Sequence, residues 1–140
     1  MDRKEFLASL GIGAAVLACA DCLQGCTPLT GPSVPTAPTN VNLSVDLTAS
    51  ANSALKSPGG FIYDGGLIIA RLANGSYAAL SQTCTHQGGT VQYLSSNNIF
   101  FCPVHGSTFS TNGSVLNGPA TKPLVKYNVS VNGTTLLVTS

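Results

Sequence analysis

Two short cysteine-histidine motifs hold the residues of this chain that could bind a metal. The first places Cys84 and His86 two positions apart, and the second places Cys102 and His105 three positions apart, with residues 87–101 between the motifs. Both histidines of the protein fall in these motifs. Thiolate and neutral imidazole are good ligands for iron and zinc, and two loops can bring four such groups around one centre. The spacing therefore predicts a four-ligand metal site.

The composition of each motif helps to choose the metal. Zinc sites of the Cys2His2 type usually pair two cysteines in one motif and two histidines in the other. Here each motif is mixed: it reads C-T-H-Q-G and then C-P-V-H-G-S. This sequence resembles the Rieske family, whose pattern is C-x-H-x-G followed by C-P-x-H-G. The matching positions are Cys84, His86, Gly88, Cys102, Pro103, His105, Gly106 and Ser107. A zinc-stabilised binding module is the alternative from another class of protein.

The resemblance implies one [2Fe-2S] cluster per chain, in which two histidines replace two cysteines on one iron. Cys84 and Cys102 would hold the inner iron, and His86 and His105 the outer iron nearer the surface. Two ferric ions, two sulfides and two thiolates sum to zero charge, whereas a core with four thiolates carries two negative charges. An electron is added more easily to the neutral centre, so the histidines raise the reduction potential. Such a site transfers single electrons, and we expect no catalytic residues beyond the cluster.

Residues around the motifs also match the family. Gly88 belongs to the first motif, and Ser107 matches a serine that donates a hydrogen bond to a cluster sulfide. A tyrosine that commonly donates to a ligand cysteine is replaced here by Phe109. Gly118, Pro119 and Ala120 match a proline-containing third loop that packs over the cluster. Because such neighbours tune the potential, the loss of the tyrosine hydroxyl should lower it.

One feature of the respiratory Rieske proteins is missing from this chain. In those proteins each loop carries a second cysteine, and the two cysteines form a disulfide. The corresponding residues are Gly89 and Val104, so this disulfide cannot form. In this respect the chain resembles the ferredoxin-like and oxygenase branches, whereas Ser107 resembles the respiratory branch.

The remaining sequence predicts short strands that would position the two motifs. Residues 41–47 alternate apolar and polar side chains, which is the period of a half-buried strand. Asn74-Gly75 and Asn132-Gly133 are strong hairpin-turn signals. Further strands are expected at 61–63, 67–72, 77–82, 91–94, 99–101, 115–116, 126–131 and 134–139, with 52–56 extending the first one. No helix is expected after the N-terminal segment. The fold class is therefore all-β, and the resemblance implies a small antiparallel sandwich or barrel with a two-loop cluster-binding subdomain.

The first 26 residues are predicted to be a signal peptide. Charged residues 2–5 precede an apolar run, residues 6–18, which is shorter than the roughly 20 residues that span a membrane. Leu23-Gln24-Gly25-Cys26 resembles a bacterial lipobox, which makes Cys26 the expected lipidation site. Cys19 is a competing candidate, and a disulfide or second metal site among the N-terminal cysteines is a further alternative. The charged region also resembles a twin-arginine signal with Lys4 in place of one arginine, so both export routes stay open.

Residues 27–40 are predicted to be a linker, because four prolines and no hydrophobic period exclude a helix or a central strand. The folded domain is expected at 41–140. The chain has 44% apolar and 8% charged residues and a formal net charge of +1, so no basic field suggests nucleic acid as a partner.

These features together predict an exported electron carrier, anchored by lipid on the periplasmic or cell-surface side of a membrane. Its redox partner would be a membrane quinol oxidoreductase, a cytochrome or a periplasmic oxidase. A second hypothesis is the small electron-transfer subunit of a molybdenum oxidase of the arsenite-oxidising kind, because Rieske subunits of that kind are also exported.

Overall fold

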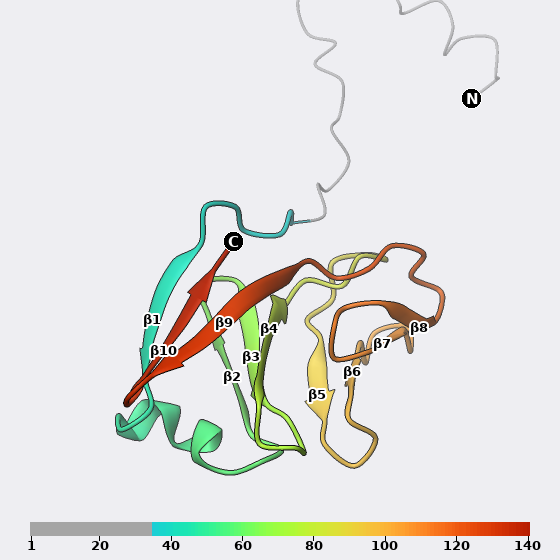
Figure 1. The fold of residues 1–140 in the computed structure, drawn as a ribbon. Helices are drawn as coiled ribbons and strands as arrows, with labels where there is room; N and C mark the ends of the chain where they lie inside the picture. Colours follow the sequence, from blue (N-terminus) through green and yellow to red (C-terminus); the bar gives the residue numbers. More distant parts are fainter. Residues whose placement is uncertain (1–34) are drawn as a thin grey trace, which may run out of the picture. The chain divides into compact units, whose positions relative to one another are not determined.

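The computed structural model describes residues 35–140, which fold into two antiparallel sheets (Figure 1). The strands are β1 (Asn42–Asp46), β2 (Phe61–Asp64), β3 (Leu67–Arg71), β4 (Tyr77–Ser81), β5 (Gln92–Leu94), β6 (Ile99–Phe101), β7 (Thr108–Phe109), β8 (Val115–Asn117), β9 (Lys126–Asn132) and β10 (Thr135–Thr139). The predicted signal peptide, its lipidation site Cys26 and the first part of the predicted linker lie outside the described residues.

The larger sheet, here called the base sheet, has the strand order β1-β10-β9-β4-β3-β2. The smaller one, here called the loop sheet, has the order β5-β6-β7-β8. In Figure 1 the loop sheet lies beside the β3–β4 side of the base sheet. The two predicted metal-binding motifs follow β4 and β6. The all-β fold with short antiparallel strands is thus confirmed.

Strand β3 is buried on both of its faces, because it lies between two hydrophobic cores. Leu67 and Ile69 pack into the core of the base sheet with residues such as Leu136. Ile68 and Ala70 point the other way, into a core shared with the loop sheet. All four of these β3 side chains are at most 1% exposed, so the strand is the common wall of the two cores. This explains why its sequence is a continuous apolar run rather than an alternating one.

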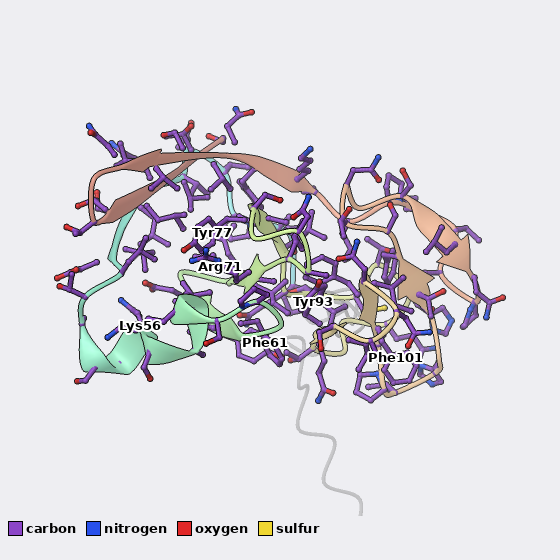
Figure 2. All side chains as sticks on the ribbon, turned by 60° about the horizontal axis from the view of Figure 1, so that its bottom comes forward. Lys56, Phe61, Arg71, Tyr77, Tyr93 and Phe101 are labelled. Carbon is purple, nitrogen blue, oxygen red and sulfur yellow. The ribbon has the colours of Figure 1, made fainter. Side chains whose placement is uncertain are left out.

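The expected strand at 52–56 is wrong, as is the expectation that no helix follows the N-terminal segment. Ser50–Lys56 instead form a short 3-10 helix, η1. Its one buried residue is Leu55, whose carbonyl accepts hydrogen bonds from Arg71 Nη1 (3.4 Å) and Tyr77 Oη (3.3 Å). Figure 2 shows these two side chains next to each other, and Arg71 Nη1 also donates to Tyr77 Oη over 2.6 Å. A single buried side chain and partners on β3 and β4 favour a tight helical turn over a strand.

The loop sheet contains a strand that the sequence analysis did not predict. β7 is only two residues long, and its pairing with β8 shifts register between Thr108 and Phe109. Such a short irregular strand has no detectable alternation. The other strands agree with the predicted ranges to within one or two residues.

The last residues of the predicted linker contact the base sheet. The Tyr127 hydroxyl donates a hydrogen bond to the Pro38 carbonyl over 2.7 Å. The Pro38 ring lies so close to Gly66 that a Cβ atom on Gly66 would be 2.8 Å from Pro38 Cγ. Across residues 35–140, no helix has both the length and the hydrophobicity needed to span a membrane.

Candidate metal centre

The two motifs form loops with the same backbone hydrogen bonds. In the first loop, the Gly88 amide donates to the Cys84 carbonyl (2.9 Å), and the Cys84 amide donates to the Gly89 carbonyl (2.7 Å). In the second loop, the Gly106 amide donates to the Cys102 carbonyl (2.9 Å), and the Cys102 amide donates to the Ser107 carbonyl (2.8 Å). Backbone hydrogen bonds alone therefore fix each cysteine at the start of a closed turn.

Glycine at the fifth position of each loop is required by the backbone. Gly88 has φ = +78° and Gly106 has φ = +82°. This left-handed region costs a residue with a Cβ atom about 1–2 kcal/mol. A Cβ atom on Gly106 would meet no atom within 4 Å, so its conformation alone explains that glycine. Both loops thus need glycine in order to turn the histidine-bearing segment back toward its cysteine.

The two cysteines are buried in the core that the sheets share. Cys84 and Cys102 are each 1% exposed, and neither forms a disulfide. Burial raises the pKa of the Cys84 thiol above its ordinary value, and the neighbouring Cys102 acts in the same direction. Hydrogen bonds from the His86 amide and the Ser107 hydroxyl act in the opposite direction. A buried thiol that is costly to ionise alone is suited to binding a metal cation, which stabilises the thiolate form.

The two imidazoles meet at the end of the loops. His86 Nδ1 and His105 Nδ1 are 3.2 Å apart. The two rings are nearly perpendicular, with an interplanar angle of 88° and centroids 4.8 Å apart. His86 is half-buried and His105 is exposed. The same ring nitrogen of each histidine therefore faces a common point, as two ligands of one metal atom would.

This arrangement fits a binuclear centre better than a mononuclear one. The thiols form one buried pair and the imidazoles form a second pair nearer the solvent. Among residues 35–140, no three Cys, His, Asp or Glu side chains are grouped around a point where they could hold a single metal ion. Structural zinc needs about four ligands around one ion, whereas two pairs of ligands suit two irons bridged by sulfides.

Segment 120–122 holds both loops in place, and the sequence analysis did not predict its contacts. The Ala120 amide donates to Ser107 Oγ over 3.0 Å, and Ser107 is fully buried. The Thr85 hydroxyl donates to the Lys122 carbonyl over 2.6 Å. The preceding residues, Gly118 and Pro119, are exposed. These contacts join residues far apart in the chain, and the only available signal was a small hydroxyl residue inside the first motif and another just after His105.

The two departures from the respiratory pattern are also visible. Phe109 is fully buried in the same core as both cysteines. A tyrosine at this position would therefore have its ring in the same buried core. Gly89 and Val104 lie against each other across the loops: a Cβ atom on Gly89 would be 3.2 Å from Val104 Cβ and 2.6 Å from its Cγ2. The two residues therefore face each other, although neither can form a disulfide.

An antiparallel β fold that carries one pair of buried thiols and one pair of imidazoles is typical of small iron-sulfur proteins with mixed cysteine and histidine ligands. A family model described as the Rieske [2Fe-2S] domain matches residues 46–128. This chain belongs to the Rieske family. It accordingly carries a [2Fe-2S] cluster and transfers electrons through it, as the sequence analysis predicted. The alternative of a zinc-stabilised module is not supported.

Solved structures agree with this assignment. The cyanobacterial plasma membrane Rieske protein PetC3 from Synechocystis PCC 6803 has a TM-score of 0.57 and 31% sequence identity, over 70% of this chain and 99% of that chain. The ferredoxin of carbazole 1,9a-dioxygenase from Nocardioides aromaticivorans IC177 has a TM-score of 0.54 and 24% identity, over 73% of this chain and 98% of that chain. The latter likeness concerns the fold alone.

Curated relatives cover a shorter stretch. The cytochrome b6-f complex iron-sulfur subunit of Chlorobaculum thiosulfatiphilum is 31% identical over 71 residues, which is 51% of this chain and 39% of that protein. The corresponding subunit of Prochlorococcus marinus (strain MIT 9515) is 44% identical over 59 residues, 42% of this chain and 33% of that protein. The match thus spans less than half the length of these relatives.

Proposed function

We propose that Cys84 and Cys102 bind one iron of the cluster, that His86 and His105 bind the other, and that the domain carries electrons on the outer side of a membrane. The observation that supports this most is the position of the imidazole pair. The two Nδ1 atoms are 3.2 Å apart and His105 is exposed, whereas both thiols are buried. The histidine end of the cluster is then the end that a redox partner can approach.

The bound cluster supplies the ability to take up and release one electron. The protein's own residues set the conditions for that step. The buried core around Cys84 and Cys102 excludes water from the cysteine end of the cluster site, and electrostatic interactions are stronger where water is excluded. The Ser107 hydroxyl is fully buried beside the cysteines and accepts a hydrogen bond from the Ala120 amide; a hydroxyl that donates to a cluster sulfur would favour the more electron-rich reduced state.

For the partner, we propose a membrane quinol oxidoreductase. The relatives named as subunits of the cytochrome b6-f complex and the one named as a plasma membrane Rieske protein support a membrane setting. Lipid attached to Cys26, followed by the linker up to residue 40, would supply the anchor in this chain. Several acyl chains hold a protein firmly on a bilayer, whereas one binds only marginally.

The partner can be identified from detergent-solubilised membranes that contain the full chain. We expect the chain to co-purify with a quinol-oxidising complex or a cytochrome and to be reduced when a quinol is added. The matched control is His105→Ala, which should lose that reduction without losing the lipid anchor. Co-purification with a molybdopterin subunit instead would favour the arsenite-oxidase-like hypothesis and contradict the proposal.

The anchor can be tested separately by mass spectrometry. Acyl groups should be found on Cys26, and Cys26→Ala should leave the precursor unprocessed. Acyl groups on Cys19 would move the anchor to that residue. A chain recovered without acyl groups, from the soluble fraction, would contradict lipid anchoring while leaving the electron-transfer proposal intact.

A further inference from the structure

Gly89 is a glycine for a different reason from the two loop glycines described above. It has no positive φ, so the left-handed backbone that requires glycine at the other two positions is not the reason here. The space around it is what excludes a side chain. A Cβ atom would lie 2.6 Å from Val104 Cγ2, 3.1 Å from Cys102 Sγ and 3.2 Å from Val104 Cβ. Real Cβ atoms essentially never approach another heavy atom to 2.6 Å, so residue 89 is glycine because the second loop occupies that volume.

Val104 makes this contact from an unusual position. It is 56% exposed and lies between Pro103 and His105, in the segment that carries the exposed imidazole. The part of its side chain that is not exposed covers the backbone of Gly89 in the first loop. Among residues 84–89 and 102–107, this is a direct apolar contact between the two loops, and it lies next to the ligand sulfur of Cys102.

From this geometry we infer that Gly89 and Val104 form a non-covalent clasp that sets the distance between the two loops, and with it the spacing between the Cys84–His86 and Cys102–His105 ligand pairs. The inference rests on the proposed ligand set. The clasp contains no sulfur, so thiol reductants and oxidants cannot open or close it. Both residues act as positioning residues, because neither has a group that could bind iron.

A double-mutant cycle tests the clasp. Gly89→Ala should force the loops apart, because overpacking of a tight contact is destabilising. We expect release of iron to a chelator to become about tenfold faster, with a shifted reduction potential and an altered visible circular dichroism spectrum. Val104→Ala removes Cγ2, the nearest of the three atoms, and leaves Cys102 Sγ at 3.1 Å and the Cβ atom of residue 104 at 3.2 Å. The double variant Gly89→Ala, Val104→Ala should therefore recover most, but not all, of the loss in the iron-release rate, the potential and the spectrum.

Gly106→Ala is the matched control. Its Cβ atom would meet nothing within 4 Å, but the residue has φ = +82°, so the substitution introduces backbone strain without a contact between the loops. Val104→Ala should not rescue it. Rescue of both alanine variants, or of neither, would overturn the inference. If Gly89→Ala cannot be recovered folded, the double variant must still be folded and coloured, and its absence would overturn the inference equally.

Failure of the clasp is distinguishable from failure of the proposed ligand set. If the four proposed ligands are wrong, serine or alanine at those positions will leave the native spectrum intact, whatever residues 89 and 104 do. If the ligands are right and the clasp is wrong, Gly89→Ala will release iron at the same rate as the unaltered protein.

Discussion

The base sheet and the loop sheet are stabilised in different ways. Base strands of four to seven residues pair in regular registers, and their core contains buried aliphatic residues from several strands. The loop sheet has strands of two or three residues, a shift of register, and a core that includes both cysteines. Short strands gain little from their own pairing. We therefore expect the loop sheet to gain a larger share of its stability from the bound metal than the base sheet does.

Removal of a proposed ligand should separate the two regions most strongly. Cys84→Ser, Cys102→Ser, His86→Ala or His105→Ala should abolish the native chromophore. Amide hydrogen exchange in β5–β8 should then become much faster, while β3 and β4 remain protected, because only the loop sheet loses the binding free energy of the metal. Ser44→Ala on the exposed face of β1 is the control. Equal loss of protection in both sheets would show that they form one cooperative unit.

Neighbouring residues of β3 provide the next test, since their side chains enter different cores. Ile69→Ala and Ile68→Ala should each lower the free energy of unfolding by about 2–5 kcal/mol. Only Ile68→Ala should also speed the release of iron, because Ile68 packs in the core that holds both cysteines. Denaturant unfolding and chelator kinetics on the two variants measure this. If both variants release iron at the same rate, β3 does not separate the cores as described.

A smaller effect is expected from Phe109→Tyr on the loop-sheet side. The new hydroxyl would lie in the core next to the cysteines, and a hydrogen bond to a ligand sulfur stabilises the reduced state. A bond to a charged group contributes about 1.5 kcal/mol, which corresponds to an increase of about 60 mV for one electron. Protein-film voltammetry measures the potential, with Phe61→Tyr, a partly buried residue beside the same core, as the control. A lower potential, with the bond confirmed by structure, would contradict this prediction.

The smallest expected effect is on the stability of the base sheet at acid pH, through Asp46 at the end of β1. The Thr48 hydroxyl and amide donate to Asp46 Oδ1, both over 2.7 Å, and lower the pKa of this exposed carboxyl. A lowered folded-state pKa means that the unfolded chain binds the proton more tightly. The stability it contributes is therefore complete above the ordinary pKa of about 3.9 and is lost as the pH falls through the lowered value. Asp46→Asn should flatten this part of the pH dependence in urea unfolding.

The sequence predicted the parts of the molecule that have a local signal. The four proposed ligands stand out because cysteine and histidine are rare in the chain, and β1 and the hairpins follow from alternation and Asn-Gly turns. The helix η1 was missed because its contacts are made with Arg71 and Tyr77, which are distant in sequence. The bonds from Thr85 to Lys122 and from Ala120 to Ser107 were missed for the same reason. Likewise, Gly89 could be recognised as the position of an absent cysteine, but not as a residue excluded from having a side chain by Val104.

The matching backbone hydrogen bonds of the two loops have a consequence for how the cofactor enters. Each loop closes its turn with two backbone hydrogen bonds at its cysteine, whose carbonyl accepts one and whose amide donates the other, so part of the ordering of the chain comes from the turn itself. Metal sites on unfolded loops lose part of their binding free energy to that ordering. Here each turn is closed by local backbone bonds, so less of the ordering has to be supplied by the metal. Insertion should then lose less binding free energy to ordering than it would on loops without such bonds.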